Sequence, residues 1–224
     1  MSLTICSTVF LFLFGISFVQ QAAAAESCIA SYGDVSPSNP DPIGPAEYTI
    51  KFDTNIFRSD GSPAEPIVIS VNRSWAPIGA DHLYSVMSDG FYDCAAFFRV
   101  VPDFVVQFGI AASPAETAKW NIPIVDDPVL QSNLPWTVTY ATAGPDTRTT
   151  QLFINTVDNS RLDSDGFAPF GMVTQGFDTV LAIVNPTPDS SDGVNQVEYT
   201  KLGNDWLLNK YPDISLISAS VLSN

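Results

Sequence analysis

Short runs with an apolar residue at every second position recur along the chain, and each predicts a half-buried β-strand. Such runs lie at 48–53, 136–141 and 151–155. A nearly continuous apolar run at 67–71 is typical of a buried strand. A last apolar run at 214–222 can close the sheet that these strands form. The pattern therefore indicates a mainly β protein.

Two segments carry apolar residues at helical spacing instead. The first is expected to run from about Pro77, which can occupy the first turn of a helix, to Asp89. The second, at 177–184, has apolar residues at i, i+3, i+4 and i+7. The four prolines within 111–135 predict mostly loop there. Many short strands and two helices favour a closed antiparallel β-barrel capped by two α-helices.

The N-terminal segment has the pattern of a secretory signal. The first 25 residues contain no charged side chain, and an apolar run at 9–19 precedes two glutamines and four alanines. The run is too short to be a membrane span. We therefore expect a signal peptide at 1–25, a Pro-rich lead-in at 26–46 and a folded domain at 47–224. The protein would enter the secretory pathway, as a secreted or lumenal protein with no stable membrane insertion.

The charge balance limits the classes of partner and cofactor. The formal net charge of the chain is −15, and no cluster of Lys and Arg is present to neutralise phosphates. A nucleic acid partner is therefore not expected. With a single histidine and no Cys-x-x-Cys, the chain also lacks the ligands of a zinc site, so neither a metal nor another cofactor is predicted.

Two residue types suggest covalent modification. Cleavage of the signal peptide would leave only Cys28 and Cys94, and an even pair in an oxidising compartment predicts a disulfide. Two buried free thiols are the alternative. Asn72 begins the glycosylation sequon Asn-Arg-Ser, whose occupancy the sequence leaves open.

One arginine lies within an apolar hairpin-like pair. The runs at 97–101 and 104–109 are joined by the turn dipeptide Pro102-Asp103. Alternation places Arg99 in the middle of the first strand, and Val105 and Gln107 on one face of the second. A cation there must be paired or must point at a ligand. A salt-bridged arginine on an edge strand is the simplest interpretation of this segment alone.

The wider pattern resembles the cyclophilin family. Residues 97–109 match the signature Phe-x-Arg-Val-(Val/Ile)-Pro-x-Phe-x-x-Gln, and 141–154 are similar to Ala-Asn-Ala-Gly-Pro-x-Thr-x-x-Ser-Gln-Phe-Phe-Ile. A third block at 162–171 is similar to the family's Leu-Asp…Phe-Gly segment. The three blocks follow in family order, and the resemblance covers about 48–222. It implies the eight-stranded barrel with two capping helices, and peptidyl-prolyl cis-trans isomerase activity.

The same resemblance implies the roles of individual residues. Arg99 would be catalytic by stabilising the twisted amide, and Gln107 would bind the substrate backbone and orient Arg99. The substrate-binding residues would be Phe104, Val105, Ala141, Thr142, Ala143, Gln151, Phe153, Leu162, Arg161 and Phe167. The chain departs from the family at four of them: Val105 replaces a Met, Thr142 a common Asn and Arg161 a Trp, and the pocket histidine is replaced around Phe167. We expect a monomer acting on proline-containing peptides and folding client proteins.

Two other functions are compatible with parts of the sequence. The first is a catalytically silent module that binds proline-containing segments, although it would not need both Arg99 and Gln107. The second is a calcium-dependent secreted β-domain, suggested by the acidic segment 163–166, which lacks the remaining ligands of a calcium loop. His82 has no nucleophile motif to accompany it and is expected to be a structural or surface residue.

Overall fold

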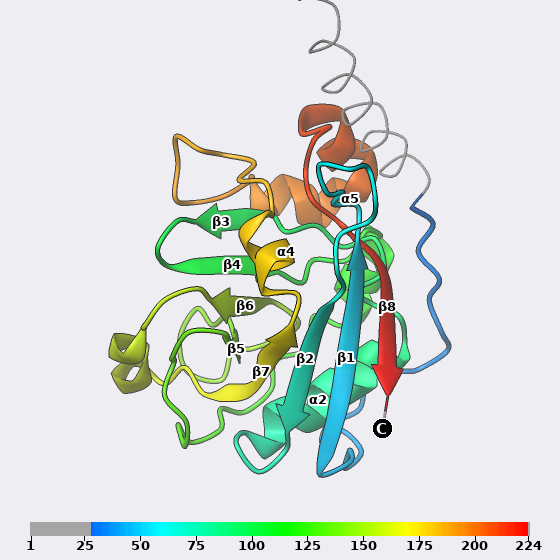
Figure 1. The fold of residues 1–224 in the computed structure, drawn as a ribbon. Coiled ribbons are helices and arrows are strands. Elements are labelled where there is room, and N and C mark those ends of the chain that lie inside the picture. Colours follow the sequence, from blue (N-terminus) through cyan, green and yellow to red (C-terminus); the bar gives the residue numbers. More distant parts are fainter. Residues whose placement is uncertain (1–27, 224) are drawn as a thin grey trace, which may run out of the picture.

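Eight strands form one antiparallel sheet in a computed structural model, which describes residues 28–223 (Figure 1). The strand order is β3-β4-β6-β5-β7-β2-β1-β8. The strands are β1 (Glu47–Thr54), β2 (Ile67–Asn72), β3 (Arg99–Val101), β4 (Val105–Phe108), β5 (Thr137–Tyr140), β6 (Leu152–Asn155), β7 (Pro169–Gln175) and β8 (Ile217–Ser223). The mainly β prediction is confirmed. The predicted signal peptide, 1–25, lies outside the described residues.

The sheet is an open, curled half-barrel, so the predicted closed barrel is wrong. Its two edge strands, β3 and β8, approach each other only through the residues that precede them, at the isolated bridge between Ala96 and Leu216. Beyond that bridge Phe98, the residue just before β3, has another partner, because the backbone N–H of Val194 donates to its carbonyl at 2.9 Å. A loop at 185–195 thus occupies the place where a closing strand would pair (Figure 1, orange).

The helices differ from the two that the sequence predicts. Helix α2 (Pro77–Ser88) is confirmed, and α4 (Phe177–Leu181) is shorter than expected. Two helices were missed, α3 (Pro114–Lys119) and α5 (Gln196–Lys210), so the two-helix cap is wrong. The apolar pattern of α5 is weak because the helix buries only three residues and is kinked at one of them, which are Tyr199, Gly203 and Leu207.

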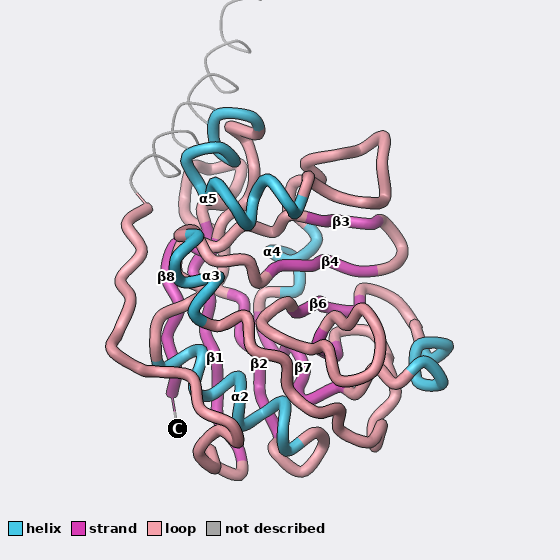
Figure 2. The backbone as a smooth tube through the Cα atoms, turned by 180° about the vertical axis from the view of Figure 1, so that it is seen from behind, coloured by secondary structure: helices cyan, strands magenta, loops and turns pink. Residues whose placement is uncertain are grey.

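The main core fills the hollow of the sheet beneath α2. The aromatic rings of Phe52, Tyr92 and Phe108 meet there with centroids 5.6–5.9 Å apart. Seen from behind, α2 and α3 lie over the strands β1, β2 and β8 (Figure 2). A second apolar cluster lies under α5 and includes Phe98 and Leu216, the residues around the bridge between the two edges. No helix of residues 28–223 is long and apolar enough to cross a membrane.

The lead-in contains no helix or strand from 28 to 46, and it is fastened to the domain at several points. The predicted disulfide between Cys28 and Cys94 is confirmed. Further along, Asp89 accepts hydrogen bonds from the backbone of Gly33 and Val35. His82 is buried and its Nδ1 lies 2.7 Å from Oδ2 of Asp41, so it has a structural role.

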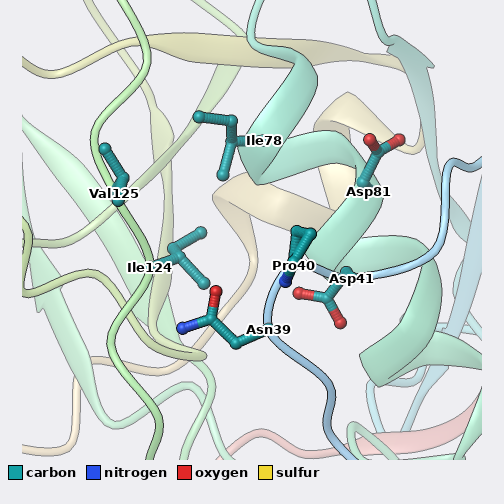
Figure 3. A pocket seen from close by; sticks show the side chains of 7 residues that line it. All are labelled: Asn39, Pro40, Asp41, Ile78, Asp81, Ile124 and Val125. Carbon is teal, nitrogen blue, oxygen red and sulfur yellow. The ribbon is translucent and has the colours of Figure 1, made fainter.

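A small cavity lies between the lead-in and α2, away from the residues predicted to bind substrate. Its volume is about 150 Å³. Figure 3 shows the seven side chains that line it, which are Asn39, Pro40, Asp41, Ile78, Asp81, Ile124 and Val125. Because these residues come from the lead-in, α2 and the loop before β5, the cavity is the gap left where the irregular lead-in packs on the helix.

We predict that the disulfide contributes strongly to stability, because it joins residues 66 positions apart. In the chain-entropy model a loop of this length corresponds to about 4 kcal/mol of unfolding free energy. The double variant Cys28→Ser, Cys94→Ser should therefore unfold at lower denaturant than the oxidised wild type, and dithiothreitol should remove the difference. Equal midpoints before reduction would contradict this.

Candidate active site

A chain of polar side chains crosses the edge of the sheet at β3 and β4. The strand register places Arg99 directly opposite Gln107, and Nη1 of the arginine donates to Oε1 of the glutamine at 3.0 Å. Nε2 of Gln107 in turn donates to Oε1 of Gln151 at 2.9 Å. Three of the predicted site residues are therefore connected, and Gln107 orients the guanidinium as the sequence suggested.

The loop at 185–195 holds the other side of the guanidinium. Nε of Arg99 donates to the carbonyl of Ser191 at 2.6 Å. Two residues on, Gly193 has a φ of +76°, and a Cβ there would lie only 2.6 Å from Cβ of Arg99. Glycine is needed both for this backbone conformation and for the close approach. Sequence analysis missed this support, although Asp192-Gly193 is a typical turn dipeptide.

The guanidinium of Arg99 has hydrogen-bond partners, but none of them neutralises its charge. No carboxylate oxygen of residues 28–223 forms an ion pair with it, so the interpretation as a salt-bridged edge-strand arginine is wrong. Burial lowers the pKa of the guanidinium, and the nearby charge of Asp192 acts in the opposite direction. Since arginine is not deprotonated in proteins, the site keeps a full positive charge at neutral pH.

An apolar cluster, which corresponds to the predicted proline pocket, lies beside this polar chain. Val105, Phe153 and Leu162 form a separate buried cluster, and three partly buried residues, Phe104, Ala141 and Phe167, pack against it. The rings of Phe153 and Phe167 meet edge to face with centroids 5.7 Å apart. Six of the residues predicted to bind substrate are thus brought together. They come from four separate parts of the chain.

The turn between β3 and β4 explains how Phe104 and Val105 reach the same pocket. Strict alternation would place these neighbours on opposite faces of a strand. Asp103 has a φ of +54°, and the backbone N–H of Phe104 donates to the carbonyl of Val101 at 3.1 Å. Phe104 therefore belongs to the turn and not to the strand, so its side chain is free to fold over the pocket.

Thr142 and Ala143 lie in the loop that follows β5, outside the apolar cluster. Both bond to Thr147: the Thr142 hydroxyl lies 2.9 Å from that of Thr147, and the Ala143 N–H donates to the same hydroxyl. The preceding residue, Ala141, donates its N–H to the carbonyl of Gln151. The loop consequently forms a rim next to the polar chain.

Arg161 lies at the opposite side of the pocket, at the start of the 3₁₀ helix η1 (Ser160–Asp165). Its Cζ is 4.7 Å from the centroid of the Phe104 ring, and the Cζ of Arg99 is 5.9 Å from the same centroid. Nη1 of Arg161 donates to Oδ1 of Asn159 at 2.9 Å. Arg161 is exposed, whereas Asn159 is fully buried.

Buried amides support the pocket from below, and sequence analysis did not single them out. Nδ2 of Asn159 donates to the carbonyl of Phe104, and Nδ2 of Asn133 donates to that of Phe167. The two amides are connected through Asn155, which bonds to each of them. The backbone carbonyls of Phe104 and Phe167 are thus both held by hydrogen bonds from buried amides.

Asp163 anchors η1 to this amide network. Its carboxylate accepts hydrogen bonds from the hydroxyl of Ser132 and from the backbone N–H of Asn133. Burial acts to raise the pKa of Asp163, but these hydrogen bonds outweigh it and the pKa is lowered. The first carboxylate of the segment that suggested a calcium loop therefore has a structural partner.

Comparison with known proteins identifies the arrangement. The family model described as cyclophilin type peptidyl-prolyl cis-trans isomerase/CLD matches residues 55–203. A peptidyl-prolyl cis-trans isomerase of Acinetobacter baylyi is 34% identical over 136 residues, covering 58% of this chain and 72% of its own. That of Streptomyces antibioticus, cyp18, is 33% identical over 142 residues, covering 58% and 84%.

Solved structures support the fold. The crystal structure of a cyclophilin type peptidyl-prolyl cis-trans isomerase from Cryptosporidium parvum superposes with a TM-score of 0.57. The superposition covers 80% of this chain and 98% of the other, at 18% sequence identity. The half-barrel described above is therefore a cyclophilin fold.

We expect Gly193→Ala to release the Arg99 side chain. The added Cβ would meet backbone and Cβ atoms at 2.6–3.0 Å, so the loop must move and the bond from Nε to Ser191 must lengthen. In NMR spectra the Nε–H signal of Arg99 should then exchange faster with water. Gly61→Ala, at another positive φ in the turn between β1 and β2, is the matched control and should leave the signal unchanged. Unchanged exchange in Gly193→Ala would show that the loop does not hold Arg99.

Asp163 should give the pocket a pH-dependent stability. A carboxyl group whose pKa is lowered by folding stabilises the native state above its unfolded pKa, and this contribution is lost as the pH falls through the folded pKa. Wild type should therefore be more stable than Asp163→Asn near neutral pH, and the difference should fade in acid. Denaturant titrations from neutral to acidic pH measure it; a difference that does not change with pH would contradict the prediction.

Proposed function

This chain belongs to the cyclophilin-type peptidyl-prolyl cis-trans isomerase family, and on that premise we propose how it acts and where. Arg99 accelerates rotation about Xaa-Pro bonds by stabilising the twisted amide electrostatically, and Gln107 orients it. The substrates are proline-containing segments of proteins in the secretory pathway or outside the cell. The proline ring occupies the apolar pocket around Val105, Phe153 and Leu162.

The chemistry requires no nucleophile. Amide resonance creates a rotation barrier of about 18–20 kcal/mol, although the two isomers of an Xaa-Pro bond differ by only about 0.5–1 kcal/mol. Resonance is lost in the twisted state, and the proline nitrogen becomes pyramidal and basic. A fixed cationic donor therefore interacts more strongly with the twisted state than with either planar one. Each ~1.4 kcal/mol of this difference increases the rate tenfold.

The observation that carries the proposal is the way Arg99 is held. Its bonds to Ser191 and Gln107 go to a carbonyl and an amide oxygen, which are neutral acceptors. The guanidinium is thus fixed in direction while its charge remains available to a substrate. The pocket of Val105, Phe153 and Leu162 lies beside it, and the Phe104 ring contacts both.

The proposed compartment has two supports. The first 25 residues have the pattern of a signal peptide, and the disulfide between Cys28 and Cys94 requires an oxidising environment to persist. Detection of the protein in the medium of expressing cells, with its N-terminus near Glu26, would test this proposal.

Replacement of Arg99 should abolish most of the activity. We expect Arg99→Ala to lower kcat/KM for an Xaa-Pro peptide about 100-fold or more, the usual effect of removing a charge-stabilising donor from a catalytic site. Arg99→Lys should recover only part of the loss, because an ammonium lacks the planar fork that bonds both Gln107 and Ser191.

The control for this experiment is Arg58→Ala, in the turn between β1 and β2, which should retain full activity. Circular dichroism of each variant verifies the fold. A wild-type protein that is folded and binds proline peptides without isomerising them would refute the mechanism and favour a binding module.

A further inference from the structure

The two arginines at the site form no ion pair with a carboxylate of residues 28–223. Of the nine Lys and Arg residues, four form ion pairs in the described part of the chain, namely Lys51, Arg73, Lys119 and Arg148. Arg99 and Arg161 are not among them, although the chain has 24 acidic residues. Both guanidinium groups instead lie within 6 Å of one ring centroid, that of Phe104.

Arg161 is held in place but remains open to solvent. Its Nη1 donates to Oδ1 of Asn159, and the same amide donates to the carbonyl of Phe104 and to Oδ1 of Asn155. A buried residue therefore fixes the guanidinium against the ring that covers the pocket. Among the described residues only Nη1 has a hydrogen-bond partner, so the other nitrogens can bind a carboxylate, for which the planar guanidinium is well suited.

The acidic neighbours of Arg161 in the sequence do not take this place. The carboxylate of Asp158 accepts from the backbone N–H of Ser160, and that of Asp163 is bonded to Ser132 and Asn133. Neither forms an ion pair with Arg161 in residues 28–223. Because no carboxylate of residues 28–223 pairs with Arg161, its guanidinium is open to a carboxylate of another molecule.

We propose that Arg161 makes this isomerase prefer proline segments with an acidic residue directly before or after the proline. The inference rests on the proposed function, because a proline in the pocket brings its neighbouring residues next to Phe104 and Arg161. Arg161 is in this role a specificity-determining residue. An exposed ion pair of this kind is modest in strength, so a preference of about two- to fivefold is expected.

The test uses two sets of peptides that differ at one position. In the first set the residue before proline is Glu, Gln or Lys. In the second set the residue after proline is Glu, Gln or Lys. Gln has the shape of Glu without its charge, so the ratio of kcat/KM for Glu and Gln isolates the carboxylate. The uncatalysed rate is subtracted for each peptide, and dissociation constants are measured on the same peptides by titration.

Four proteins are compared: wild type, Arg161→Gln, Arg161→Lys and Arg58→Gln. In wild type the Glu/Gln ratio should be about two to five in one of the sets, with Lys below both. Arg161→Gln should lower the Glu/Gln ratio to one or less. Arg161→Lys should retain part of the preference for Glu. Arg58→Gln removes the same charge from the turn between β1 and β2, near the opposite end of the strand order, and should retain the full ratio.

The outcomes separate this inference from the proposed function. Equal turnover of Glu and Gln peptides in both sets would overturn the acidic preference and leave the isomerase activity intact. An equal loss of the ratio in Arg58→Gln and Arg161→Gln would also overturn it, because the effect would then reflect net charge. Tighter binding of a Glu peptide that depends on Arg161, without turnover of any peptide, would support the inference and refute the mechanism at Arg99.

Discussion

The site depends on one constraint: a partly buried cation must be satisfied without being neutralised. A buried charge requires hydrogen-bond partners, and a carboxylate is the most common one. At Arg99 the partners are the amide oxygen of Gln107 and the carbonyl of Ser191, which are dipoles and carry no net charge. A carboxylate in either place would hold the side chain equally well but would also neutralise the charge that the proposed mechanism requires.

The open edge of the sheet is what makes this arrangement available. If β8 paired along the whole of β3, the barrel would close and the backbone edge of β3 would be occupied. Instead the N–H of Val194, in the loop at 185–195, bonds to the carbonyl of Phe98 just before β3, and the same loop reaches Arg99 through Ser191. The feature in which the fold departs from a closed barrel is therefore the one that orients the Arg99 side chain. The backbone groups of the loop at 185–195 therefore both bond to the open end of the sheet and hold the guanidinium of Arg99.

The sequence predicts those parts whose information is local or periodic. Alternation identified β1, β5 and β6, helical spacing identified α2, and the ordered motifs brought Arg99, Gln107 and the apolar cluster together, whereas β7 was not predicted. Helix α5 was missed because it buries few residues and is kinked at Gly203. The contribution of Ser191 could not be read from the sequence, since it is made by a backbone carbonyl that any residue carries. The amides of Asn133, Asn155 and Asn159 are single residues that meet only after folding.

Arg161 repeats the solution found at Arg99, and this gives the site a sign opposite to that of the molecule. Its guanidinium is also held by an amide oxygen, from Asn159, and it also retains its charge. The net charge of −15 is spread over the whole chain, and at physiological salt its reach is limited to about 8 Å. A peptide close to Phe104 therefore experiences the two guanidinium groups, and the few carboxylates near them such as Asp192, more strongly than the remaining carboxylates of the chain. An acidic protein surface and the proposed preference for acidic substrates are compatible for this reason, because salt screens the charges that lie far from the site.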